Sequence, residues 1–285
     1  MPDFPIVDSH LHLWDPHVFR LSWLDGNDLL NRRYDLADYA RQTEGVASGA
    51  TVYVQTDVET PYALLEAKVV AELAREEPRL QGIVAWAPLE YGEQARAFLL
   101  ELLKTGPHLK GVRRILQSEP DPNFCLHPKF VRGVQMLAEY GLSFDLCIQH
   151  RQMQSIIALV RQCPHTAFIL DHCGKPNIKD HELHPWSEQI TELAAFPNVC
   201  CKLSGLVTEA DLQNWTHEDL APYVSHVLAS FGEDRVLFGG DWPVVLQAAS
   251  YTRWVETLDI LTASLSPQTR RKLWADNARH FYRLD

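Results

Sequence analysis

The chain has 285 residues, a formal net charge of −11, and 46% hydrophobic against 22% charged residues. This balance excludes a disordered or fibrous chain, and the negative charge argues against a nucleic-acid or anionic-membrane surface, which needs concentrated positive charge. No apolar run approaches the roughly 18 residues that a membrane helix needs, and residues 1–5 lack the pattern of a signal peptide. We therefore expect a cytoplasmic protein that binds neither nucleic acid nor membrane.

Eight short apolar stretches recur along the chain, and the segments between them have helical periodicity. The predicted strands are Ile6–His12, Ala50–Gln55, Gln81–Pro88, Lys110–Leu116, Leu142–Gln149, Ala167–His172, Val199–Ser204 and Val236–Asp241. Residues Ala63–Ala74 illustrate a predicted helix, with Leu65, Val69 and Leu73 at a spacing of four. Alternating strands and helices imply parallel βαβ units, and eight of them predict an α/β protein with a single (β/α)8 TIM barrel over residues 1–285.

Loop lengths indicate which face of the barrel carries function. Connections into the strands are short, as at Glu77-Pro78 and Gly106-Pro107, whereas connections leaving them are longer, as at Trp14–Tyr34 and Gly174–Trp186. In such barrels the long loops after the strands, at the C-terminal face, build the active site. The polar residues that end the strands are therefore the candidate functional residues.

Two histidines end the first predicted strand, in Asp8-Ser9-His10-Leu11-His12. Because side chains alternate along a strand, His10 and His12 project to the same side and can reach one point in the barrel mouth. Neutral imidazoles that converge in this way suit a divalent metal. A bare pair of this kind is more often two unrelated polar residues, but its place at the end of strand one favours a metal site.

The eighth strand ends at Asp241, next to the first strand in a closed barrel, so its carboxylate would face the two histidines. An aspartate before a loop is usually a cap, but this position favours a metal ligand or a general base that takes a proton from water. Gly239 and Gly240 before it would leave room for a ligand. His172 ends the sixth strand and needs a partner in the barrel mouth, while Asp171 would point the opposite way and only brace loops.

Other features have structural interpretations. Six cysteines without CxxC spacing are expected to be core thiols. Ser266-Pro267 predicts the start of a closing helix that packs on the barrel.

Several motifs occur in order from the first strand to the eighth. They are DSHLHLWDP at Asp8–Pro16, SWL at Ser22–Leu24, LDHCGKP at Leu170–Pro176, KLSGL at Lys202–Leu206 and FGGDWPV at Phe238–Val244. This set resembles the amidohydrolase superfamily, within it amidohydrolase family two, and most of all the sugar-lactonase branch of L-fuconolactonase- and L-rhamnonolactonase-like proteins. The likeness covers nearly the whole chain.

The resemblance implies that His10, His12 and Asp241 bind metal where metal is present. It also implies that Asp241 is ligand or base and that His172 orients the attacking water or the substrate carbonyl. Strand four ends in Arg113-Arg114 and lacks the lysine that bridges two metals in binuclear members. We therefore expect at most one divalent ion, with zinc first among the candidates, and the resemblance allows it to be loosely held or dispensable.

The end of strand five offers two further candidates. Asp145, Cys147 and Gln149 form one row of this strand, and the apolar row should face the helices, so Gln149 should face the barrel and hydrogen-bond the substrate. His150 would point inward only if the strand has already bent. It stays a weaker candidate for a metal ligand.

A sugar lactone is neutral and polyhydroxylated, so it needs hydrogen-bonding groups and a flat aromatic face. The candidates on the substrate side are Arg113 or Arg114, Gln149, Lys202, Ser204, Trp14, Trp23 and Trp242. A cationic side chain could polarise the lactone carbonyl in place of a metal. Packing is the commoner role for any one tryptophan. Arg113 could equally well pair with an acidic neighbour and take no part in substrate binding. Glu90 is equally a solvated loop residue or a ligand.

These observations favour a hydrolase that opens a small sugar-acid lactone, such as a deoxy-aldonolactone of a fucose- or rhamnose-like pathway, by water attack on the carbonyl. A dicarboxylate lactonase of aromatic degradation is one alternative, and it would need several converging arginines. A decarboxylase on the same scaffold would need firmly bound metal with His150 as a ligand. A non-enzymatic carbohydrate-binding barrel has no need for His10, His12 and Asp241 together. A homo-oligomer is left open.

Overall fold

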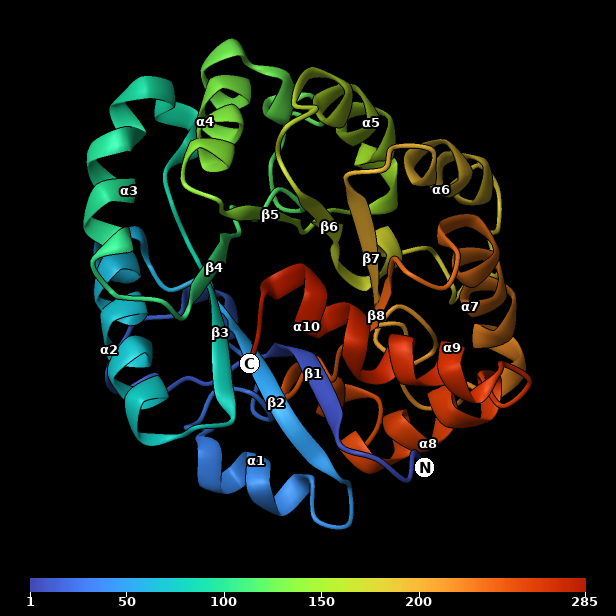
Figure 1. Ribbon diagram of the computed structural model, residues 1–285. Coiled ribbons are helices and arrows are strands. Elements are labelled where there is room, and N and C mark those ends of the chain that lie inside the picture. Colours follow the sequence, from blue (N-terminus) through green and yellow to red (C-terminus); the bar gives the residue numbers. More distant parts are fainter.

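Eight parallel strands pair in sequence order, from β1 to β8, in a computed structural model that describes residues 1–285. The strands are β1 (Ile6–Leu11), β2 (Ser48–Val54), β3 (Leu80–Ala85), β4 (Leu109–Val112), β5 (Ser143–Leu146), β6 (Phe168–Leu170), β7 (Val199–Leu203) and β8 (Val236–Phe238). Backbone hydrogen bonds from Asp241 to His10 and from His12 to Trp242, each 2.8 Å, join the two ends of the sheet. The predicted (β/α)8 barrel is therefore confirmed (Figure 1).

Helices surround the strands on the outside of the barrel, except α10, which lies over one end (Figure 1). They are α1 (Leu36–Gln42), α2 (Ala63–Glu76), α3 (Arg96–Leu103), α4 (Pro128–Glu139), α5 (Met153–Gln162), α6 (Trp186–Ala194), α7 (His217–Phe231), α8 (Tyr251–Leu261), α9 (Pro267–Arg271) and α10 (Asn277–Tyr282). None of them combines the length and the apolar character that crossing a membrane would require.

The helix predicted at Ala63–Ala74 is present as α2, but its buried face differs from the apolar repeat in the sequence. Leu65 and Val69 are 49% and 54% exposed, whereas Ala67 and Ala71 are buried. Small alanines let the helix approach the strands closely, so Ala67 and Ala71 lie on the contact face together with Val70, while Leu65 and Val69 stay outside.

All eight predicted strands are present, but each ends earlier than predicted. β4 stops at Val112 and β5 at Leu146, so Arg113 and Gln149 belong to the connections that follow. Alternation of side chains no longer applies in these connections. The early ends of β4 and β5 therefore determine where the candidate residues that follow these strands lie.

The barrel interior is layered. An apolar cluster that includes Val7, Val52, Ile169 and Leu237 fills one layer, and Tyr282 of α10 packs into it. Figure 1 shows α10 lying over one end of the barrel, with the C-terminus near its centre. The closing helix predicted at Ser266-Pro267 begins as α9, where the Ser266 hydroxyl accepts from the Thr269 amide at 3.1 Å. The helical run that follows ends in α10, which closes this end of the barrel.

Tyr282 also reaches a charged layer above the apolar one. Its hydroxyl donates to Asp145 Oδ2 at 2.6 Å, and both side chains are fully buried. Because a buried carboxylate needs hydrogen bonds, this contact joins the end of the chain to the polar centre of the barrel.

We expect Tyr282→Phe to lower the free energy of unfolding by about 1–3 kcal/mol, since it removes one hydrogen bond from a buried carboxylate. Urea denaturation followed by tryptophan fluorescence measures the change. Tyr91→Phe is the control, because Tyr91 is 57% exposed and should tolerate the same deletion. Equal stability of the two variants would contradict this account.

Candidate active site

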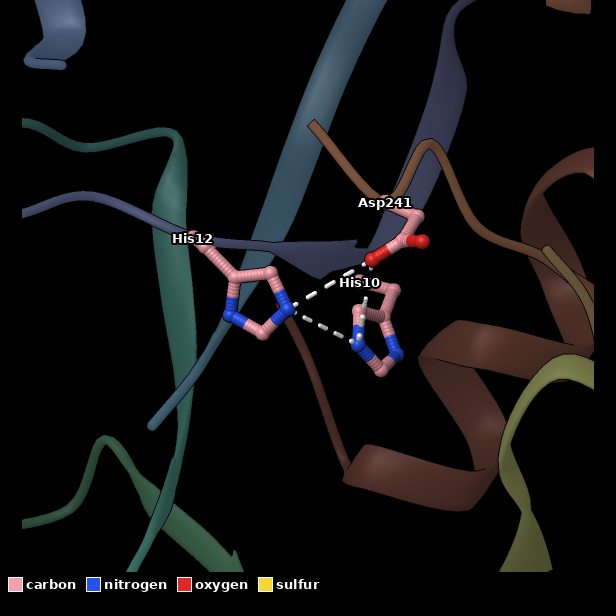
Figure 2. Close-up of side chains that lie close together, drawn as sticks. All are labelled: His10, His12 and Asp241. Atoms are coloured by element: carbon pink, nitrogen blue, oxygen red, sulfur yellow. Dashed lines mark hydrogen bonds and ion pairs between the residues drawn. The ribbon is translucent and has the colours of Figure 1, made fainter. Parts of the chain in front are cut away.

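Three acceptor side chains meet where β1 and β8 adjoin (Figure 2). His10 Nε2 and His12 Nε2 are 3.2 Å apart, and Asp241 Oδ1 lies 3.5 Å from the His12 nitrogen and 3.8 Å from the His10 nitrogen. All three residues are buried. The structure therefore brings together the residues that sequence reasoning proposed as metal ligands.

Asp8 holds the two strand ends in this arrangement. Its Oδ1 accepts from the backbone amides of His10 at 3.0 Å and Gly240 at 2.7 Å, and its Oδ2 accepts from the hydroxyls of Tyr39 and Tyr251. A Cβ atom on Gly240 would lie 2.4 Å from Asp8 Oδ2. The expectation that the glycines make room for a ligand is corrected here, because Asp8 and Tyr251 fill that space beside Gly240.

Neighbouring groups determine which ring nitrogens carry protons. His12 Nδ1 lies 2.7 Å from the carbonyl oxygen of Val54, which can only accept, so the proton is on Nδ1 and Nε2 has a free lone pair. At His10 the Asp171 carboxylate, which can only accept, lies 3.3 Å from Nδ1, and Arg113 Nη1, which can only donate, lies 3.3 Å from Nε2, so this pair of contacts puts the proton on Nδ1 and the lone pair on Nε2. Two lone pairs and one carboxylate oxygen thus face a common point.

This arrangement fits one divalent cation. Ligands of a tetrahedral zinc ion, about 2.0–2.1 Å from the metal, lie about 3.3 Å from one another, close to the 3.2, 3.5 and 3.8 Å observed here. Three protein ligands are the number that catalytic zinc sites use, with one position left for water or substrate. The donor set is therefore suited to hold such an ion.

A second cluster, made of His10, Asp171 and His172, is less suited to a cation. Asp171 is already paired with Lys202 at 2.9 Å and with Arg113 at 3.3 Å. Since both partners are positively charged and the cluster shares His10 with the first, we expect no second ion.

His172 stands beside these ligands. Its Nδ1 lies 2.9 Å from Ser204 Oγ and 4.0 Å from Asp241 Oδ2, and its ring centroid is 4.5 Å from that of His10. The partner that sequence reasoning required for His172 is thus the Ser204 hydroxyl, close to the Asp241 carboxylate.

Burial sets the charge states in the site. It lowers the pKa of the His172 imidazole to about 4, and it brings the pKa of His10 well below its ordinary value. Burial alone would raise the pKa of Asp241, but His172, His12 and His10 together bring it below its ordinary value. At neutral pH the anionic carboxylate of Asp241 therefore lies beside the neutral imidazoles of His10 and His172.

Asp171 has a different place from the one expected. β6 ends at Leu170, and Asp171 turns into the barrel instead of pointing away from it. Its Oδ1 lies 3.3 Å from His10 Nδ1, so it positions the His10 ring rather than bracing loops. Sequence reasoning missed this residue because it assumed that the strand continued.

A cavity of about 170 Å³ opens above these groups. Trp14 and Trp23 line it, with ring centroids 5.3 Å apart in an edge-to-face contact. It is also lined by His12, His172 and Asp241, together with Thr56, Asp57, Arg113, Ile115, Gln117, Ser118, Cys147, Lys175, Thr208 and Val244. Cys147 is thus a cavity residue as well as a core thiol, and Asp57, Ser118, Lys175 and Thr208 were not singled out from the sequence.

Several candidates for the substrate side lie outside this cavity. Lys202 is fully buried below it, 2.7 Å from Asp145. Trp242 is fully buried against Tyr34 and Tyr39. Lys202 is directed into the core by β7, and Trp242 packs beside the cavity from the connection that follows β8.

The remaining candidates belong to the connections after β4 and β5. Arg114 pairs with Glu90 at 3.3 Å and with Glu119 at 2.6 Å, so its charge and that of Glu90 are satisfied outside the cavity. Gln149 caps a short turn with Gln152, and His150 Nδ1 contacts a backbone carbonyl at 2.9 Å. Early ends of the two strands account for these positions.

Comparisons with known proteins show which family the chain is similar to. A model of the family described as amidohydrolase matches residues 7–284. The chain is 33% identical to an L-fucono-1,5-lactonase of Burkholderia multivorans, over 98% of this chain and 96% of that protein. It is 26% identical to an L-rhamnono-gamma-lactonase of Scheffersomyces stipitis, over 100% of both chains. A crystal structure of an amidohydrolase from B. multivorans with bound zinc has a TM-score of 0.89 and 32% identity, and covers 99% of this chain and 100% of that chain.

We expect the chain to retain no more than one zinc ion after equilibrium dialysis. His12→Ala should weaken that binding by at least about tenfold, since loss of even an outer partner of a metal ligand typically costs 10–100-fold. Elemental analysis of the dialysed protein measures both effects. His181→Ala, at an exposed histidine, is the control for adventitious binding, and two tightly held ions per chain would contradict the single donor set.

Proposed function

The chain belongs to the amidohydrolase family, and we propose that it opens a sugar-acid lactone by attack of water on the lactone carbonyl. The substrate in this proposal is a deoxy-aldonolactone such as L-fucono- or L-rhamnono-lactone. The names of the two relatives support this choice, and both relatives match nearly the whole chain.

The observation that carries the proposal is the Asp241 carboxylate. It is buried, it lines a small cavity, and its Oδ2 lies 4.0 Å from neutral His172. A negatively charged oxygen in a site that excludes bulk water can hold a water molecule and accept its proton as the water attacks.

In the proposed reaction Asp241 accepts the proton of the attacking water and His172 orients the water or the carbonyl. The opened ring leaves a hydroxy acid. Trp14 and Trp23 provide the flat apolar face that the carbon skeleton of a sugar ring needs. A divalent ion held by His10, His12 and Asp241 would supply Lewis acidity toward the water or the carbonyl oxygen.

The two enzymatic alternatives have less support. A dicarboxylate needs converging arginines, but Arg113 is the one arginine that lines the cavity, and its Nη2 donates to the Gln55 carbonyl at 2.6 Å. A decarboxylase with His150 as a metal ligand would need that ring near His10 and His12, but its Nδ1 contacts the Lys175 carbonyl instead.

We expect a six-carbon deoxy-aldonolactone to be hydrolysed much faster than any ester, amide or phosphate. A panel of aldonolactones and dicarboxylic lactones, followed by proton release with a pH indicator, tests this with and without chelator. Turnover of amides alone would contradict the proposal. If the chelator leaves the rate of lactone hydrolysis unchanged, side chains and not a metal ion polarise the carbonyl.

Asp241→Asn should lower kcat on the best lactone by about 10²–10⁴-fold, since it keeps the size of the side chain and removes the charge that accepts the proton. Asp28→Asn, the same change at an exposed position, should leave the rate unchanged. Circular dichroism checks that both variants fold. If Asp241→Asn keeps more than about a tenth of the parent rate, the substitution has raised the activation barrier by less than about 1.4 kcal/mol, which is too little for loss of an essential base.

A further inference from the structure

Four successive residues after β6 have left-handed backbone conformations. The φ angles of His172, Cys173, Gly174 and Lys175 are 54°, 54°, 72° and 53°. Only glycine adopts this region without steric cost, and strained backbone of this kind is concentrated at functional sites. The strain therefore indicates that this turn positions side chains with a function.

Specific contacts hold the turn. The Lys175 amide donates to the His172 carbonyl at 2.9 Å, and the Lys175 carbonyl accepts from His150 Nδ1 at 2.9 Å. The indole of Trp186 donates to the Cys173 carbonyl at 2.7 Å. Since the turn is held at both ends, it places the side chains of His172 and Lys175 together on the wall of the cavity.

The other cationic side chains near the strand ends already form ion pairs or hydrogen bonds within the protein. Lys202 lies between Asp145 and Asp171. Arg114 pairs with two glutamates outside the cavity. Arg113 does line the cavity, but its two Nη atoms contact Gln55, Asp171 and His10. Apart from the buried Nε of Arg113, which has no hydrogen-bond partner, the charged groups of these side chains are already paired.

Lys175 differs from them. Its one carboxylate neighbour is Glu209, with Nζ and Oε1 3.7 Å apart, beyond hydrogen-bond distance. The two side chains are 18% and 20% exposed, so they are partly shielded from water. The ammonium group of Lys175 therefore has donors available at the wall of the cavity that holds Asp241 and His172.

We propose that Lys175 contacts the carbonyl oxygen of the lactone and stabilises the oxyanion formed when water attacks. This inference rests on the proposed function and assigns a catalytic residue to it. The water oxygen bonds to the carbonyl carbon, its proton goes to Asp241, and the electron pair of the C=O bond moves to the oxygen beside Lys175. When the C=O bond re-forms, the ring C–O bond breaks and the ring oxygen takes the proton from Asp241. The acid then loses its own proton to solvent, and its carboxylate faces the same ammonium group.

Lys175→Met tests this step, because methionine has a similar length and no charge. We expect kcat on the best lactone to fall by about 10²–10³-fold, as for loss of one oxyanion donor, with a much smaller change in KM. Lys175→Arg should recover part of the rate, which a merely structural role would not require. The control is Lys179→Met, the same change at an exposed position four residues further along the chain. It should have the rate of the parent protein, and its melting temperature should equal that of Lys175→Met.

Binding of the ring-opened product gives a readout that does not depend on turnover. Calorimetric titration of L-fuconate into chelator-treated protein should show binding to the parent and to Lys179→Met, and at least about tenfold weaker binding to Lys175→Met, which corresponds to about 1.4 kcal/mol. Equal binding together with equal kcat in the two methionine variants would overturn the inference and leave the proposed function in place. If the parent hydrolyses no lactone but Lys175→Met loses L-fuconate binding, the proposed function fails and the carboxylate contact stands. A parent that neither hydrolyses lactones nor binds L-fuconate would overturn both.

Discussion

A lysine ammonium group at the centre of the barrel is the interaction on which the site depends. Lys202 Nζ lies 2.7 Å from Asp145 Oδ2 and 2.9 Å from Asp171 Oδ1, and all three side chains have no exposed surface. Isolated charges in such a place would be very costly, so each requires the others. The pairing keeps Asp171 ionised, since Lys202, the contact with His10 and Arg113 together overcome the effect of burial and hold the pKa of Asp171 well below the ordinary value.

The layers above follow from this pairing. Asp171 lies against His10 Nδ1 and Arg113 lies against His10 Nε2, so the ring cannot rotate without breaking a charged contact. Asp8 joins the backbone of β1 to the loop after β8, and this contact brings Asp241 to the two histidines. The cavity is thus supported by fixed charges and hydrogen bonds rather than by its loops alone.

Sequence reasoning predicted the order of the elements because apolar strands and turn residues alternate plainly along the chain. It also brought His10, His12 and Asp241 together, since β1 and β8 must adjoin in any closed barrel. Where it depended on side-chain alternation beyond a strand end, it lost accuracy. β6 ends one residue before Asp171 and β5 ends three residues before Gln149, and strand length is set by pairing in the whole sheet. The place of Lys175 follows from a left-handed turn that no residue pattern signals, apart from the single glycine before it.

The contact between Tyr282 and Asp145 has a consequence for how the molecule is made. It joins residues 137 positions apart, and the Asp8 contact to Gly240 joins residues 232 positions apart. Contacts of such separation form late, because a long loop must be closed before either bond is gained. Because synthesis runs from the N-terminus, Asp145 and Lys202 are made before α10, and Asp145 gains its hydrogen bond from Tyr282 only after α10 has been made.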